Sequence, residues 1–314
     1  MLTRRHIRVK VMQSVYSFSL SKSDRLESEV AFFKGSVAAT FDLYLLLLAL
    51  IKAVAAAAEE QLETYRKNKI EDQKRIAALE LLLQNSASRF IVQHPILAQL
   101  LKNKKIDQWD LEFKFLKDLI NLLFESEAFV QHTALEAPNA KDDVQLLVYF
   151  FRHIITPHPY LFNYLEDREL TWVDDLPIVN TFLLKTLKKI KVNDVSSLPF
   201  PQPVVSKEDM DFGVDLLEKV IGNEASLEPE LIGKTPNWDP DRIAQLDAII
   251  LKIAIGELLY FPSIPPKVTL NEYLEIAKDY STPKSNHFVN GVLDKLVKEF
   301  SSAQRLQKSG RGLQ

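Results

Sequence analysis

Apolar residues recur along this chain mostly at the spacing of an α-helix, and no convincing stretch shows the alternation of a β-strand. Leu, Ala, Lys and Glu dominate these stretches. The pattern predicts an all-α protein. The expected helices cover about 3–20, 24–67, 70–84, several shorter stretches between 86 and 191, then 206–221, 228–232, 240–260, 270–280 and a last helix from Ser285.

The last helix contains Asn290-Gly291, a dipeptide that often forms the turn of a β-hairpin. The apolar positions around it instead follow one helical stripe, and Ser285 is expected to cap the helix start. Glycine inside a helix costs about 1 kcal/mol relative to alanine. We therefore expect another helix to pass close to Gly291, or the surface there to be used. The stripe consists of Phe288, Val289, Val292, Leu293 and Leu296.

The most apolar run of the chain is LYLLLLALIKAVAAAA, between Asp42 and Glu59. A membrane span needs about 20 mostly apolar residues. This run is shorter and contains Lys52. We expect a buried core helix here and no membrane contact.

Prolines mark the expected breaks between helices, at Pro95, Pro138 and the Pro157/Pro159 pair. The clearest boundary is SSLPFPQPVV, residues 196–205, whose three prolines favour an extended linker. Ser206 with Asp209 resembles a capping box that opens the next helix. The polar, basic tail 301–314 is expected to be disordered.

Two stretches show a weak internal echo. WVDD, starting at Trp172, precedes IVNTFLLKTLKKI, and WDPD, starting at Trp238, precedes LDAIILKIAIGEL. The echo could mark a repeated bundle, or it could reflect only that helices of a bundle look alike.

The chain has 314 residues, a net charge of −3 and no Cys. This length suits one large domain or two smaller ones. The lack of Cys excludes disulfides and thiolate sites and fits the reducing cytoplasm, where we expect the protein. Arg8 and Lys10 interrupt any apolar run after the first basic residues, so we expect no signal peptide. With this net charge, nucleic-acid binding would need a local basic patch.

Motifs for catalysis are missing from the sequence: there is no P-loop, dinucleotide fingerprint, H-E-x-x-H or G-x-S-x-G. The closest histidines, His153 and His158, have poor ligand spacing and are expected in a loop or at a helix end. We expect no metal, no cofactor and no enzymatic activity.

Basic residues crowd the first helix, with no acidic residue before Asp24. Guanidinium groups pair well with phosphate, and a Tyr ring can stack on an unpaired base. Gln13 and Tyr16 extend the polar face. A solvated basic helix start would explain the same stretch. The basic residues are Arg4, Arg5, His6, Arg8 and Lys10. The expected buried side consists of Ile7, Val11, Val15 and Phe18.

RRHIRVKVMQSVYSF, residues 4–18, resembles the N-terminal arginine-rich motif of the NusB transcription antitermination family. The C-terminal third is more similar still. Trp238, then DRIAQLDAIILKIAIGELLYFPSIPPKVTLNEYLEIAKDYS and SNHFVNGVLDKL, follow the family pattern nearly element by element. The resemblance covers about 1–20 and 206–300, and an insertion that compact members lack lies between them.

The resemblance implies two packed helical bundles with a large helical insertion. The expected segments are an arginine-rich helix 1–22, an enlarged bundle 23–195, the linker 196–205, a C-terminal bundle 206–300 and the tail 301–314. Family members are not enzymes. They pair with ribosomal protein NusE, bind boxA-type leader RNA and help the RNA polymerase elongation complex to read through ribosomal RNA operons.

The same resemblance suggests site residues. The candidates for RNA binding are Arg4, Arg5, His6, Arg8, Lys10, Gln13, Tyr16, Lys284, Phe288 and Asn290. Asp247 and Lys252 match positions that meet NusE. His6 stands where many relatives have Arg, and Lys284 replaces an acidic residue of some members. Tyr16 and Phe288 could equally be core residues.

Two other functions compete with this one. A NusB-like domain of an RNA cytosine methyltransferase would precede a Gly-rich cofactor domain with catalytic Cys residues, and this chain has no Cys. A helical protein–protein scaffold of this fold without RNA binding is the main alternative.

Overall fold

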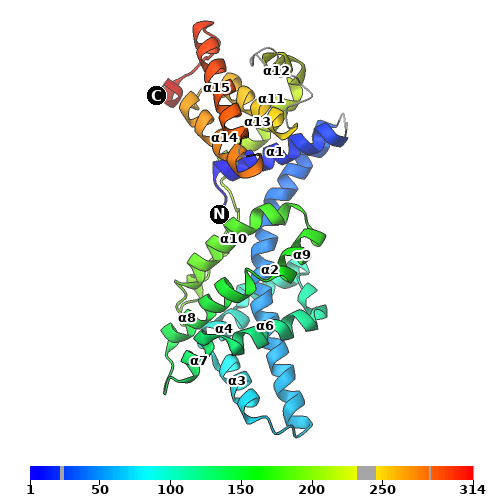
Figure 1. Cartoon of the computed structure of the whole chain (residues 1–314), viewed down its shortest axis with the longest axis vertical. Coiled ribbons are helices and arrows are strands. Elements are labelled where there is room, and N and C mark those ends of the chain that lie inside the picture. Colours follow the sequence, from blue (N-terminus) through cyan, green and yellow to red (C-terminus); the bar gives the residue numbers. More distant parts are fainter. Residues whose placement is uncertain (22–24, 232–244, 283, 314) are drawn as a thin grey trace. The chain divides into compact units, whose positions relative to one another are not determined.

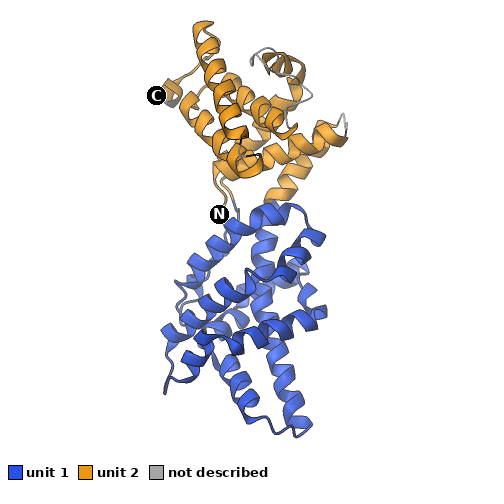
Figure 2. Ribbon diagram, viewed as in Figure 1, with its two compact units in different colours: residues 1, 38–204 blue, residues 2–37, 205–314 orange. Residues whose placement is uncertain are grey.

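A computed structural model describes residues 1–21, 25–231, 245–282 and 284–313. The described residues contain helices and no strand, as expected for an all-α protein. They divide into two compact units, one of Met1 and Ala38–Val204 and one of Leu2–Val37 and Val205–Gln314 (Figure 2). The first is called unit 1 below, and the second unit 2.

Unit 1 contains most of the long helix α2 (Leu26–Lys67) and the helices that follow it (Figure 1). These are α3 (Gln73–Gln84), α4 (Ser86–Val92), α5 (Pro95–Lys104), the 3-10 turn η1 (Gln108–Leu111), α6 (Phe113–Glu125), α7 (Glu127–Thr133), α8 (Ala140–Tyr149), the π-turn η2 (Phe150–Ile155), α9 (Pro159–Arg168), α10 (Thr171–Leu187) and the 3-10 turn η3 (Val195–Ser197).

The apolar run of α2 lies in the core of unit 1, as predicted. Residues 43–48 are at most 1% exposed. A helix that is apolar on every side must be covered on every side. By length and composition alone α2 could cross a membrane, but 72% of its most apolar window is buried inside the structure.

Two of the prolines at the predicted breaks are helix starts, whereas Pro138 and Pro157 lie in the connections before α8 and α9. Pro95 and Pro159 occupy the first turns of α5 and α9, where a missing N–H costs nothing. His94 and His158 precede them, and their Nδ1 atoms accept from the amides of the first helical turns. Both histidines therefore act as N-caps. Among the described residues, no group of three or more His, Asp or Glu could hold a metal ion.

The predicted linker 196–205 packs on unit 1. Leu198 and Val204 are buried. The Tyr44 hydroxyl donates to the Pro199 carbonyl at 2.8 Å, and the amino group of Met1 donates to the Val204 carbonyl at 2.7 Å. The prolines exclude helix, while the residues between them supply apolar contacts.

Unit 2 is arranged around α13 (Gln245–Tyr260), which is buried from Ile249 to Leu258 apart from its Lys252 side chain. Its other elements are α1 (Arg4–Ser21), the start of α2, α11 (Lys207–Gly222), α12 (Glu224–Leu231), α14 (Pro266–Tyr280), α15 (Ser285–Ser302) and the 3-10 turn η5 (Gly310–Leu313). Helix α1 packs on α11, α13 and α14. Trp238 and the expected helix start at Pro240 lie outside the described residues, and so does the WDPD stretch of the internal echo, whereas the LDAIILKIAIGEL stretch lies in α13.

The glycines of unit 2 differ in their surroundings. A Cβ at Gly213 would lie 2.3 Å from Phe33 Cζ and 2.7 Å from Ile7 Cγ2, so α11 can approach α1 and α2 only with glycine there. A Cβ at Gly291 would meet nothing within 4 Å. The expectation that a helix passes close to Gly291 is wrong.

Two further expectations about the C-terminal region fail. Ser285 does not cap α15 with its side chain; it is buried, and its hydroxyl is bonded to those of Ser281 and Thr282. The described part of the tail is also ordered. Arg305 pairs with Glu230 at 2.7 Å, and the Ser309 amide donates to the Pro262 carbonyl at 3.0 Å.

Candidate nucleic-acid interface

Helix α1 brings its arginines against acidic residues of α11, α13 and α14. The middle of α1 is buried on most sides, because Ile7, Arg8, Val11, Met12 and Val15 continue one wide stripe. Only the first turn and the last two turns keep exposed polar positions. The environment of each arginine therefore depends on its place along the helix.

Arg8 lies in the core of unit 2. Its Nε and Nη2 atoms donate to the two carboxylate oxygens of Glu257 at 2.7 and 2.9 Å, and the two side chains are 3% and 0% exposed. Thr269 and Tyr273 also donate to Glu257, at 2.8 and 3.1 Å. The Arg8 guanidinium lies 5.1 Å from the centre of the Phe212 ring.

Burial opposes the charge on Arg8, but the hydrogen bonds and charge of Glu257 raise its pKa above the ordinary value. Two paired charges inside a core hold a fixed geometry. The prediction that Arg8 faces RNA is therefore wrong for this conformation. Its role is to join α1 to α13.

Lys10 is also buried, with 2% of its surface exposed, and cannot offer its charge to RNA here. Its burial was not predicted, because a lysine between Arg8 and Gln13 reads as part of a polar face. The expected apolar side is confirmed for Ile7, Val11 and Val15, whereas Phe18 is half-buried.

Arg4 and Arg5 lie at the surface, with 39% and 41% of their side chains exposed. Arg4 Nε donates to Asp209 Oδ1 at 2.6 Å and its Nη2 to Glu208. Arg5 Nε and Nη2 donate to the two oxygens of Glu272 at 2.9 and 3.1 Å. Both arginines are thus engaged, but within reach of solvent.

These ion pairs also change the pKa values of the acidic partners. The hydrogen bond from Arg4 lowers the pKa of Asp209, and the bond from Arg5 lowers the pKa of Glu272. Ser206 caps α11 by accepting from the Asp209 amide at 3.1 Å, as predicted, while the Asp209 carboxylate turns to Arg4. The local charge of this surface is therefore largely balanced.

The other predicted residues of α1 differ in their exposure and contacts. His6 Nδ1 is bonded to the amide and hydroxyl of Thr3, at 3.1 and 2.8 Å, which fixes the start of the helix. Gln13 is half-buried and Tyr16 is exposed. A groove of about 730 Å³ beside the first turn is lined by Arg4, Arg5, His6 and Glu272, among others.

The predicted residues of α15 are accessible to different degrees. Lys284 is exposed, and Phe288 and Asn290 are half-buried. The end of α1 contacts the first turn of α13, where Gln245 donates to Ser19 at 3.4 Å. In the same turn Asp247 accepts at 2.5 Å from Ser281, which precedes α15 and is bonded to Ser285. The first turn of α13 therefore connects the end of α1 to the segment before α15.

The predicted partner residues are engaged within unit 2. Asp247 is buried and its bond from Ser281 organises the turn before α15. Lys252 is half-buried and pairs with Glu224 of α12.

The acidic partners of the arginines were not identified from the sequence. One signal was present: Glu257 is an acidic residue inside the apolar helix IILKIAIGELLY. A carboxylate buried in such a helix needs a cationic partner. Nothing in the spacing showed that the partner is Arg8, which is 249 positions away.

Comparison with known proteins gives a consistent result. The NusB family model matches residues 181–298. That range begins within α10 and does not include α1. A "Transcription antitermination protein NusB" of Chloroherpeton thalassium is 41% identical over 128 residues, which are 40% of this chain and 61% of that protein. One of Salinibacter ruber is 49% identical over 85 residues, 27% of this chain and 53% of that protein.

A third relative of the same name, from Listeria monocytogenes, is 34% identical over 116 residues, which cover 37% of this chain and 91% of that protein. The matches thus span less than two thirds of the first two relatives and nearly all of the third. A solved structure of T. maritima NusB is 23% identical and covers 52% of this chain and 94% of its own, with a TM-score of 0.30.

Proposed function

Because this chain belongs to the NusB family, we propose that it is an RNA-binding factor in transcription antitermination. Its relatives are named transcription antitermination proteins. The proposed ligand is boxA-type leader RNA, and the proposed partners are NusE and the RNA polymerase elongation complex. The proposed location is the cytoplasm, and the proposal includes no catalytic step.

The observation that carries the proposal is the position of α1. This helix packs in one compact unit with α11, α13 and α14, in the region that matches the family. Arg4 and Arg5 are partly exposed there, and Tyr16 is exposed about three turns along the same helix. Phosphate oxygens suit the guanidinium groups, and a base can stack on the Tyr ring.

An incoming phosphate would exchange with carboxylates already present. Glu208 is 81% exposed, so water already solvates it and it can turn away from Arg4 at little cost. Glu272 is held by both Arg5 Nε and Nη2 and is the stronger competitor. Each arginine therefore keeps one carboxylate that a phosphate must displace: Asp209 at 2.6 Å from Arg4, and Glu272 at 2.9 Å from Arg5.

The balanced charge favours a second candidate, a helical protein–protein scaffold without RNA binding. All three arginines of α1 have carboxylate partners inside unit 2. If these pairs do not open, α1 has a structural role only, and the interaction surfaces lie elsewhere.

The two candidates differ in a titration of labelled boxA-type RNA, with and without NusE, at several salt concentrations. We expect Arg5→Ala to weaken binding about fivefold at 0.1 M salt, because one phosphate contact to a single strand contributes about 0.7 to the salt slope. The slope of log affinity against log salt concentration should fall by about 0.7 in this variant.

Arg305→Ala is the matched control. Arg305 is 42% exposed and pairs with a carboxylate at 2.7 Å in the same unit, so its loss changes charge and ion pairing equally. Its RNA affinity should stay within twofold of the parent protein. Equal affinities for both variants and the parent would favour the scaffold.

A further inference from the structure

Unit 1 has a dense group of lysines at the end of α10. Lys185 lies in the last turn of the helix, Lys188 at its C-cap, and Lys189 and Lys191 in the turn that follows. All four are exposed. No ion pair joins any of them to a carboxylate within the described part of the chain. We call these four residues the α10 lysine patch.

The patch has a rigid base. Leu183, Leu187 and Ile190 are buried on the opposite side, so α10 cannot roll without exposing them. The turn after the helix is also fixed: the Lys191 amide donates to Ser197 Oγ at 3.0 Å, and that hydroxyl donates back to the Lys191 carbonyl at 3.2 Å. The four amino groups therefore extend from a fixed backbone.

Helix stability alone does not explain this charge. Cations near a helix C-terminus gain about 0.3–1 kcal/mol, but the effect is confined to the last turn. Like charges one turn apart, as at Lys185 and Lys188, cost about 0.2–0.5 kcal/mol. The nearest acidic residue along the chain is Asp194, whose carboxylate accepts from the amide and hydroxyl of Ser196. The Ser196 hydrogen bond and, to a smaller extent, the charge of Lys191 lower the pKa of Asp194, so Lys191 is partly compensated. Lys185, Lys188 and Lys189 keep positive charge that no ion pair within the described residues balances.

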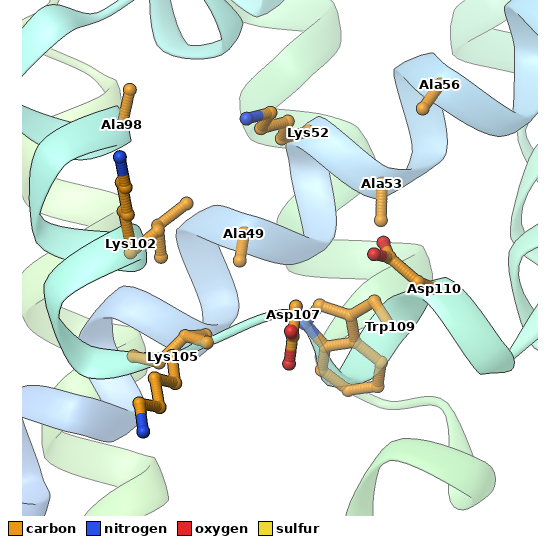
Figure 3. Close-up of a pocket in the computed structure, with 12 residues that line it drawn as sticks. Ala49, Lys52, Ala53, Ala56, Ala98, Lys102, Lys105, Asp107, Trp109 and Asp110 are labelled. Carbon is orange, nitrogen blue, oxygen red and sulfur yellow. The ribbon is translucent and has the colours of Figure 1, made fainter.

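A second group of lysines in unit 1 shares a groove with carboxylates. Lys52, Lys102 and Lys105 line a groove of about 450 Å³ between α2, α5 and the segment leading to η1. The same groove holds Asp107 and Asp110, which Figure 3 places on either side of Trp109. Its charges are therefore mixed, unlike those of the patch.

We propose that the α10 lysine patch binds the phosphodiester backbone of single-stranded RNA, as a contact separate from α1. Lysines act as point charges without the fork of arginine, so they recognise phosphate without reading sequence. The choice of RNA as ligand rests on the proposed function. The patch would extend the bound length of a leader transcript, and its contribution would be independent of the boxA sequence.

The test uses the full chain and a labelled 30-nucleotide unstructured RNA without a boxA-type element. Lys185→Gln/Lys188→Gln/Lys189→Gln should weaken binding about a hundredfold at 0.1 M salt and lower the salt slope by about 2, because three contacts contribute about 0.7 each. The control Lys52→Gln/Lys102→Gln/Lys105→Gln removes the same charge from the groove in Figure 3 and should stay within twofold. Circular dichroism should show equal melting of both variants.

Each other outcome overturns the inference. Equal losses in both variants would reduce the effect to net charge, and no loss in either would leave the patch without a ligand of this class. If polyglutamate competed for the patch as strongly as RNA at equal concentration of negative charge, the patch would be assigned to acidic proteins. A parallel titration of Arg5→Ala with boxA-type RNA keeps the two hypotheses apart, since that variant retains the patch.

Discussion

The two basic regions of this protein look alike in sequence and differ in their surroundings. The arginines of α1 pack against acidic residues of α11, α13 and α14, and each has a carboxylate partner. The lysines at the end of α10 pack against nothing acidic that pairs with them in the described residues. The number of basic residues in a stretch of sequence therefore does not show how much positive charge is free to bind a ligand. That depends on whether acidic residues pack against the stretch and pair with it.

The largest effect is expected from breaking the buried ion pair between Arg8 and Glu257. Arg8→Ala leaves the Glu257 carboxylate fully buried without its cation. Removing one partner of a buried ion pair typically costs about 3–5 kcal/mol. Urea unfolding should show a loss of this size, with α1 released from α13.

Arg305→Ala provides the comparison for that measurement, because it breaks a half-exposed pair with Glu230. Exposed pairs contribute about 0–1 kcal/mol. If the two variants were equally stable, the Arg8–Glu257 pair would have no structural role, and the assignment of Arg8 to the core would have to be withdrawn.

Much of the fold followed from periodicity. Helices α1 and α11 begin and end within one residue of the predicted bounds 3–20 and 206–221, since apolar stripes and caps are local signals. The prediction of one helix over 228–232 was less accurate, because α12 begins at Glu224. The asparagine-glycine pair lies inside α15, as the stripe indicated.

The site was predicted less well, because its chemistry depends on pairs distant in sequence. Periodicity placed Arg4, Arg5 and Arg8 on one face of the helix, but it could not show that Arg8 pairs with Glu257 in the core. Gly291 illustrates the same limit. Its cost in a helix suggested a close neighbour, and only the structure shows open space there.

A moderate effect is expected from releasing an arginine of α1. Glu272→Gln removes the negative charge that competes with phosphate for Arg5. We expect boxA-type RNA to bind more tightly, by up to about fivefold at 0.1 M salt, because the contact between Arg5 and phosphate no longer has to displace the Glu272 carboxylate. Glu275, 3.8 Å from Arg5, keeps its charge. Fluorescence anisotropy with the labelled RNA measures this change.

The matched variant is Glu230→Gln. Glu230 is 18% exposed and Glu272 is 21% exposed, and each pairs with a half-exposed arginine, although Glu272 also lies 3.9 Å from the buried Arg8. Only Glu272 lies on the proposed interface, so Glu230→Gln should leave RNA affinity unchanged. If both variants bound RNA more tightly, the change in net charge would explain the effect, and the assignment of α1 to the RNA interface would lose its support.

The smallest expected effect is the pH dependence of stability. Arg4 lowers the pKa of Asp209, and Arg5 lowers that of Glu272. A lowered folded-state pKa stabilises the protein above the unfolded-state values, about 3.9 for Asp and 4.3 for Glu, and that stabilisation is lost as the pH falls through the folded values. The arginines are about 40% exposed, so screening limits the total to under about 1 kcal/mol. The free energy of unfolding between pH 6 and 3 should therefore become less pH-dependent in Arg4→Gln/Arg5→Gln.

The α10 triple variant should keep the pH dependence of the parent protein, because its lysines hold no carboxylate in an ion pair. If the slope fell in the lysine variant instead, acidic residues near α10 would neutralise the patch, and the contrast between the two basic regions would disappear.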